Sequence, residues 1–177
     1  DLSQGKIGED NATLLGSMII TLIQVHTMNR AFIPEEERKV FFLYVDEFQN
    51  FATPSFIKIL SEARKYKLSL TLANQYMNQI EPEVLNAILG NAGTLATLAV
   101  GNQDSLTLSR EFGASQLLPE DLAALERFQM VLRMSINLET SAPFAAYSLP
   151  LPKNVSGQTD KIIEASRRNF GKKIEKK

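Results

Sequence analysis

Residues 40–47 read VFFLYVDE, and this stretch decides the fold. Six consecutive apolar, β-forming residues, Val40 to Val45, show no alternation with polar residues, which is typical of a strand covered on both faces. Two acids, Asp46 and Glu47, follow directly at the expected end of that strand. The stretch therefore predicts a buried strand of an α/β sheet with two carboxylates at its carboxyl end.

Helical and strand patterns alternate on both sides of this stretch. Before it, residues 11–30 predict a buried helix with a broad apolar face of Leu14, Leu15, Met18, Ile19, Leu22, Ile23 and Val25. After it, the patterns predict a helix at 54–66, a second buried strand at 68–73, a helix at 82–89, a strand at 94–100, short helices at 104–112 and 119–126, and a hairpin of strands at 129–136 and 144–149 with its turn within 137–142. Strands separated by helices in this way predict an α/β fold with a mainly parallel sheet.

The composition excludes several classes of protein. With 44% hydrophobic and 22% charged residues among 177, the chain has the composition of an ordinary globular domain and of neither a collagen-like nor a wholly disordered protein. It contains no cysteine, which excludes zinc ribbons and thiol nucleophiles. Because the chain contains a single histidine, His26, a metal cluster ligated by several histidines is excluded. His26 has no obvious acid or nucleophile partner in the sequence.

The formal charge of −1 is unevenly distributed along the chain. Residues 161–177 contain seven Lys or Arg and two Glu, a local charge of +5, so residues 1–160 carry −6. Prolines and a glycine between positions 150 and 157 mark a linker. We therefore expect one domain over residues 1–150, followed by a linker with a basic C-terminal helix and tail over residues 151–177.

Polar side chains at the predicted strand ends are the candidates for chemistry, because α/β sheets bind ligands beyond the carboxyl ends of their strands. Asp46, at a strand end, can hold a Mg²⁺ ion that bridges nucleotide phosphates, and Glu47 can activate an attacking water. Arg64 and Gln75 place a cation and an amide where we expect both to approach a phosphate. Each also has a purely structural interpretation: acids often open loops, and cations favour helix C-termini.

The chain resembles the HerA/FtsK-type P-loop ATPases, closest to the coupling ATPases of conjugation and type IV secretion. The matching segments are FFLYVDEF at 41–48, in the manner of a Walker B strand, SEARKY at 61–66 and LTLANQ at 70–75. The resemblance covers roughly residues 1–150. It implies a three-layer, RecA-like P-loop NTPase core with a mainly parallel sheet.

The resemblance also implies a role for each matched residue, with ATP and Mg²⁺ as cofactors. Asp46 would hold Mg²⁺ and Glu47 would activate the hydrolytic water. Arg64, eighteen residues after Asp46, has the offset of the arginine finger that reaches a neighbouring subunit's ATP. Gln75, eleven residues further on, has the offset of the γ-phosphate sensor.

The partners and location implied by the resemblance are those of a DNA-pumping motor. The family threads DNA through a hexameric ring and contacts its phosphates, so we expect sequence-tolerant DNA binding by a homo-hexamer. Secretion-channel or relaxosome proteins are further expected partners. No signal peptide or membrane span is visible in the sequence, so we expect a cytoplasmic protein that reaches the inner face of a bacterial membrane through upstream segments.

The sequence departs from the family at one point that matters for function. No phosphate-binding loop of the form G-x-x-x-x-G-K-[ST] occurs in the 177 residues, and the family places this Walker A loop upstream of its Walker B strand. We therefore expect the chain to be the C-terminal half of an ATPase, inactive as this fragment. Natural loss of the loop, leaving a non-catalytic module that binds a secretion or DNA-transfer partner, would give the same sequence.

A superfamily 1 helicase fragment is a further interpretation. Residues 46–49, DEFQ, also resemble the DExQ box of those helicases. The helicases follow this box with a Gly-Asp-x-x-Gln segment on the next strand, whereas here that strand ends in Ala73-Asn74-Gln75. The motor ATPase is therefore the preferred interpretation.

Overall fold

The computed structural model describes residues 2, 4–113, 115, 117–137, 139–150 and 157–172. The chain divides into two compact units, Asp1–Tyr147 and Ser148–Lys177. The first unit contains the α/β fold, and the described part of the second contains helix α7 (Thr159–Phe170). None of the helices in the described ranges is long and apolar enough to cross a membrane.

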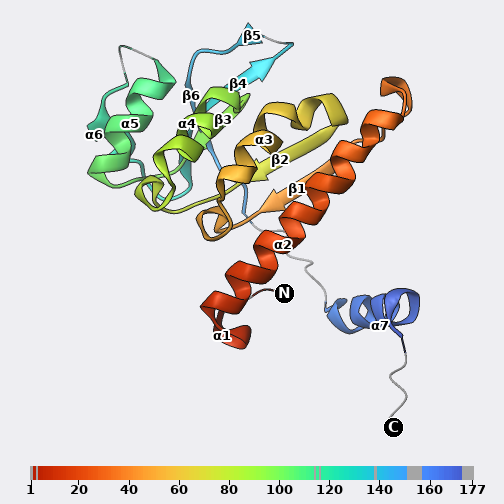
Figure 1. Cartoon of the computed structure of the whole chain (residues 1–177). Coiled ribbons are helices and arrows are strands. Elements are labelled where there is room, and N and C mark those ends of the chain that lie inside the picture. The colour runs from red at the N-terminus through yellow and green to blue at the C-terminus, as the bar shows by residue number, and fades with distance from the viewer. Residues whose placement is uncertain are drawn as a thin grey trace. The chain divides into compact units, whose positions relative to one another are not determined.

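A parallel pair of strands forms one half of the first unit (Figure 1). Strand β1 (Phe41–Val45) lies beside β2 (Leu68–Leu72), with Phe41 opposite Leu68 and Val45 opposite Leu72. The chain passes from one to the other through the short turn η3 (Phe48–Asn50), helix α3 (Pro54–Glu62) and the 3-10 turn η4 (Ala63–Tyr66). Proline at the first position of α3 suits a helix start, because its missing N–H has no helical partner there.

An antiparallel sheet forms the other half. Strand β4 (Gln129–Ile136) pairs in antiparallel fashion with β3 (Thr94–Thr97), β5 (Glu139–Thr140) and β6 (Phe144–Tyr147). The predicted hairpin of β4 and β6 is thus confirmed, but its turn is shorter than expected, because Asn137 adopts a left-handed conformation (φ 52°) and pairing resumes at Glu139. The predicted α/β class is confirmed. Of the mainly parallel sheet that the sequence predicts, the described strands form the parallel pair β1 and β2, and the strands from β3 onwards pair in antiparallel fashion.

Helices pack on these strands around two apolar clusters. The remaining elements are α1 (Gln4–Ile7), α2 (Glu9–Met28), η1 (Asn29–Phe32), η2 (Glu35–Glu37), η5 (Met77–Gln79), α4 (Pro82–Asn91), α5 (Asn102–Phe112) and α6 (Pro119–Ala123). The first cluster includes Phe48, Phe56 and Val84 and joins β1 and β2 to α2, α3 and α4. The second cluster includes Leu108, Leu122 and Val131 and joins α5 and α6 to β4. Val45 and Phe48, which flank the two acids of the site described below, belong to the first cluster.

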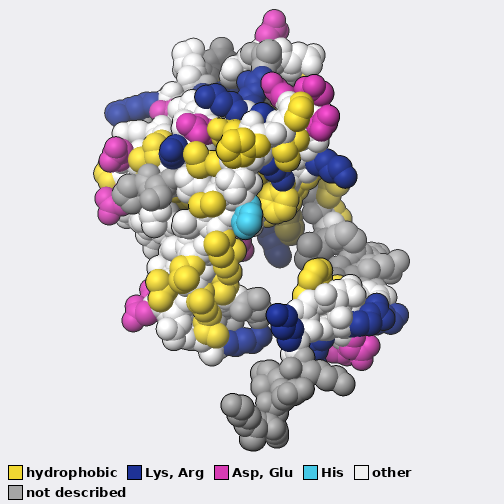
Figure 2. All heavy atoms as spheres, turned by 45° about the vertical axis from the view of Figure 1, so that its right-hand side comes forward, with side chains coloured by type: hydrophobic (Ala, Val, Ile, Leu, Met, Phe, Trp, Pro, Cys, Tyr) yellow, Lys and Arg dark blue, Asp and Glu magenta, His cyan; other side chains and the backbone are white. Residues whose placement is uncertain are grey.

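The side of helix α2 that packs against the domain differs from the side that the sequence predicts. Its buried residues are Ala12, Gly16, Ile20 and Thr27. Of the predicted apolar face, Leu14, Leu15, Met18, Ile19, Leu22 and Val25 are exposed. Figure 2 shows apolar side chains gathered in this region, next to the single histidine, His26. The prediction of a helix buried through its broad apolar face was therefore wrong for this chain, and a narrow stripe of smaller residues makes the contact.

Strand β1 is covered on one face only, in contrast to the prediction from its apolar run. Val45 is buried and Leu43 packs against the first cluster. Phe42 and Tyr44, which alternate with them and so lie on the other face, are 61% and 71% exposed. The apolar run marks a strand correctly, but the described residues supply cover for only one of its faces.

The substitution Gly16→Ala should destabilise the fold. A β-carbon built at Gly16 would overlap the ring of Phe51, which packs against the first cluster. Alanine is better than glycine in a helix by about 1 kcal/mol, but overpacking costs about 1–3 kcal/mol. We therefore expect a net loss of roughly 1 kcal/mol in the free energy of unfolding, measured by urea denaturation.

Gly90→Ala is the matched control for this prediction. Gly90 also lies in a helix, α4, and a β-carbon built there meets no atom within 4 Å. This substitution should leave stability unchanged or raise it by up to about 1 kcal/mol. Equal effects of the two substitutions would show that the contact with Phe51 does not constrain α2.

Candidate functional site

A tight turn at the end of β1 presents the two acids. Asp46 and Glu47 follow Val45, and Glu47 adopts a left-handed conformation (φ 48°, ψ 44°) that non-glycine residues seldom take. The turn is fastened to the end of β2, because the N–H of Ala73 donates to the carbonyl of Val45 (2.9 Å) and the N–H of Phe48 donates to the carbonyl of Ala73 (3.0 Å). The side chain of Phe48, only 1% exposed, anchors the turn in the first cluster.

Two amide side chains hold the carboxylate of Glu47. The Nε2 of Gln75, which follows β2, donates to Oε1 of Glu47 at 2.6 Å. The Nε2 of Gln49, in the turn η3, donates to Oε2 of Glu47 at 2.6 Å. The structure therefore brings together Glu47 and Gln75, two residues that the sequence singled out. The structure adds Gln49, which the sequence indicated only as the last residue of the DEFQ string at 46–49.

Asp46 lies beside this pair with its side chain exposed. Its Oδ1 accepts a hydrogen bond from the backbone N–H of Glu47 at 3.0 Å. No group of three or more His, Cys, Asp or Glu side chains within the described ranges is arranged to hold a metal ion. Mg²⁺ usually takes one or two protein carboxylates and completes its shell with water and substrate phosphates. The carboxylates of Asp46 and Glu47 therefore fit a Mg²⁺ ion whose remaining ligands are water and nucleotide phosphates.

Arg64 lies away from the acids. It belongs to η4, directly before β2, whereas Gln75 follows that strand. Five strand residues at about 3.3 Å each place roughly 16 Å between the two ends of β2. Arg64 and Gln75 therefore come from opposite ends of β2, and both line the cavity described below. A role for Arg64 at the site of a neighbouring subunit remains a prediction.

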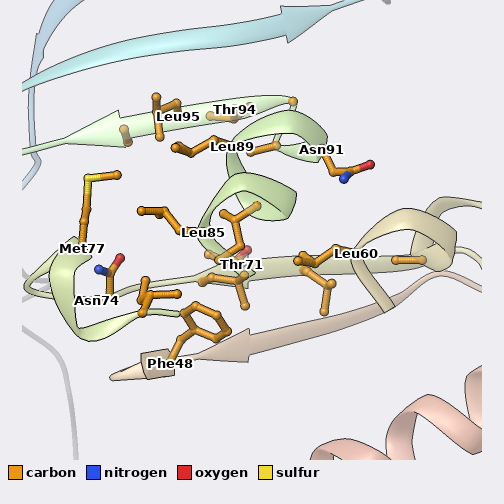
Figure 3. Close-up of a pocket in the computed structure, with 18 of the residues that line it drawn as sticks. Phe48, Leu60, Thr71, Asn74, Met77, Leu85, Leu89, Asn91, Thr94 and Leu95 are labelled. Atoms are coloured by element: carbon orange, nitrogen blue, oxygen red, sulfur yellow. The ribbon is translucent and has the colours of Figure 1, made fainter. Parts of the chain in front are cut away.

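A cavity of about 680 Å³ runs between β2 and β3. It is lined by residues of β2, β3, α3 and α4, with Leu60 on one side and Asn74 and Met77 on the other (Figure 3). Among the described strands, β2 pairs only with β1, and β3 pairs only with β4. The cavity therefore separates two strands, each of which has one edge without a strand partner in the described part of the chain.

Asp104 supports the segment that follows Gln75. It lies in the first turn of α5, is 7% exposed, and its Oδ2 accepts a hydrogen bond from the backbone N–H of Met77 at 3.2 Å. Because Met77 begins η5 two residues after Gln75, this contact fixes the direction in which the chain leaves β2. The sequence predicts Asp104 only as the start of a helix. No local pattern links Asp104 to Met77, which lies 27 positions earlier in the chain.

Comparison with known proteins supports a relation to conjugation systems. Residues 40–118 match the family described as the TraM recognition site of TraD and TraG. No curated protein matches the chain significantly.

Three solved structures resemble the chain in fold. The unbound form of the bacterial conjugative coupling protein TrwB has a TM-score of 0.62 at 14% identity, covering 77% of this chain and 38% of that one. The complex of the plasmid coupling protein TrwB with ADP and Mg²⁺ has a TM-score of 0.62 at 16% identity, covering 84% and 40%. VirB4 of Thermoanaerobacter pseudethanolicus has a TM-score of 0.50 at 19% identity, covering 68% and 34%.

These likenesses establish the fold but not the activity. At identities of 14–19%, they show that the chain has the RecA-like P-loop NTPase architecture. The chain spans between 34% and 40% of the length of the matched chains. The family match covers the segment that contains Asp46, Glu47, Gln49, Arg64 and Gln75. The chain is thus similar over residues 40–118 to the TraM recognition site of TraD and TraG, and it shares its fold with the conjugative coupling protein TrwB.

Proposed function

We propose that this chain supplies the Walker B half of an ATP-driven motor that moves DNA, or DNA with bound protein, in conjugation or type IV secretion. The observation that carries the proposal is the convergence of Glu47 and Gln75, which are 28 residues apart in sequence and joined by a 2.6 Å hydrogen bond. They meet beyond the carboxyl ends of the parallel pair β1 and β2, with Asp46 adjacent. Ligands of α/β sheets bind at such edges.

Each residue has a task in this proposal. Bound with ATP, Mg²⁺ would neutralise the charge that develops on the phosphates. Asp46, exposed and with Oδ2 directed to no described protein donor, would hold that ion through water. Glu47 would accept the proton of the attacking water, and Gln75 would contact the γ-phosphate with the amide that now contacts Glu47.

The proposal requires a phosphate-binding loop from a segment outside this chain. The chain spans at most 40% of the TrwB chains that it matches. The cavity between β2 and β3 supports the proposal, because the facing edges of these strands lack partners in the described part of the chain and would accept a further strand. Such a strand would end beside Gln75 and carry the loop to the site.

The wider assembly belongs to the same proposal. The motor would be a homo-hexamer that contacts DNA phosphates without sequence preference and works in the cytoplasm at the inner face of a bacterial membrane. The placement of Arg64, before β2 where Gln75 follows it, supports a ring, because Arg64 would then serve the site of a neighbouring subunit.

A partner-binding role is the second candidate, and the family match favours it. The matched family is described as the TraM recognition site of TraD and TraG. We propose that residues 40–118 bind a relaxosome protein of the TraM kind, and this role requires no ATP hydrolysis. The two roles are compatible, but each can fail separately.

Glu47→Gln in the full-length motor should trap ATP without turnover. The amide keeps the size of the side chain and cannot accept the proton, so we expect kcat to fall by at least about 100-fold while ATP binding persists. Steady-state hydrolysis and calorimetry measure the two quantities. Glu83→Gln, at an exposed position on α4, is the control and should not alter either quantity. Unchanged hydrolysis in the Glu47 variant would refute the assignment.

Mixing two inactive variants tests Arg64. Arg64→Ala alone should lose about 1,000-fold or more in kcat if it acts as an arginine finger. In mixed rings with Glu47→Gln subunits, some interfaces combine an intact Glu47 with an intact Arg64 from the neighbour, so activity should exceed that of either variant alone. Lys65→Ala, at the neighbouring exposed position, should retain activity. Mixed rings that show no recovery would place Arg64 outside the neighbour's site.

The partner-binding role can be measured on this chain directly. A purified TraM-type protein of the same conjugation system should bind the chain in calorimetry, and the Glu47→Gln variant should bind it with the same affinity. Loss of binding in that variant, or no binding by the unchanged chain, would contradict a role that is separate from hydrolysis.

A further inference from the structure

Gln49 contacts the carboxylate of Glu47 from within the same turn. Its Nε2 donates to Oε2 of Glu47 at 2.6 Å, and the side chain is half-buried. The second donor, Gln75, is exposed and reaches the other oxygen, Oε1. The two oxygens of Glu47 therefore have donors of different character: one enclosed beside the acid, and one exposed to solvent.

The carbonyl oxygen of Gln49 shows what orients its amide. Oε1 of Gln49 is fully buried and has no hydrogen-bond partner. Leaving a buried acceptor unpaired is unfavourable, and hydrogen bonds to an ionised acceptor are the strong ones. The opposite orientation of the amide would bring its carbonyl oxygen against the carboxylate of Glu47. The hydrogen bond to Glu47 therefore determines the orientation of the Gln49 amide, and in this orientation Oε1 of Gln49 has no hydrogen-bond partner.

The backbone around Gln49 is well fixed. The N–H of Asn50 donates to the carbonyl of Glu47 at 3.0 Å, and Phe48, between Glu47 and Gln49, is buried and bonded to Ala73. Gln49 thus donates from a rigid turn. Gln75 must redirect its amide if it is to contact a phosphate, which would leave Gln49 as the donor that still holds Glu47.

We propose that Gln49 is a positioning residue for Glu47, an inference that rests on the function proposed above. By occupying Oε2, Gln49 keeps the carboxylate oriented and leaves Oε1 as the oxygen that accepts the proton of the attacking water. Oε1 becomes available when the amide of Gln75 turns to the nucleotide. Gln49 itself touches neither water nor phosphate.

Gln49→Met in the full-length motor tests this inference, because methionine is similar in size and has no N–H to donate. Misplacing a catalytic group by about 1 Å can cost 100-fold in rate, so we expect kcat to fall by about 10- to 100-fold with KM for ATP unchanged. Thermal unfolding of the 177-residue chain should show the same or a higher Tm, because the substitution removes the unpaired buried oxygen. Gln103→Met, at an exposed position on α5, is the control and should change neither quantity.

A double variant separates positioning from a structural role. If Gln49 acts through Glu47, then Gln49→Met added to Glu47→Gln should cause no further loss of kcat. An additive loss, an unchanged kcat in Gln49→Met, or a fall in Tm that accompanies the fall in kcat would each overturn the inference. If Glu47→Gln itself hydrolyses ATP normally, the proposed function fails first; if only Gln49→Met behaves normally, the proposed function stands without this inference.

Discussion

One backbone hydrogen bond, from the N–H of Phe48 to the carbonyl of Ala73, joins the acidic turn to the end of the neighbouring strand at 3.0 Å. The ring of Phe48 packs in the first cluster with its centroid 5.1 Å from that of Phe56, so the turn is held from its backbone and from its side chain. With Phe48 fixed, the left-handed conformation of Glu47 aims its carboxylate at Gln75. The site therefore depends on core packing as much as on its polar groups.

The sequence was sufficient to place the pair that defines the site. Glu47 and Gln75 lie just beyond the predicted strands 40–45 and 68–73, and the carboxyl ends of parallel strands meet at one edge of a sheet. The contact of Gln49 was not predictable, because it requires a left-handed Glu47, and the letters DEFQ do not encode that conformation. Asp104 was missed for a related reason: its contact with Met77 joins the first turn of α5 to η5, and no periodic pattern links these two elements.

Errors in the sequence interpretation have a common physical origin. Hydrophobicity identified α2 and β1 as elements, but it did not show which side of each meets the domain. For α2, Gly16 permits the close approach of Phe51, and this contact directs the larger apolar residues outwards.

The edges of β2 and β3 that have no strand partner among the described residues, and the exposed apolar side chains of α2, affect how the purified chain behaves in solution. Open strand edges are templates for pairing with another chain, and extended apolar surfaces promote association. Prolines and inward-pointing charges protect such edges in many proteins. Strand β2, with the sequence LSLTL, contains neither. With these surfaces exposed, the 177-residue chain should be prone to aggregation at high concentration, and a solubilising fusion is the rational starting point for solution work.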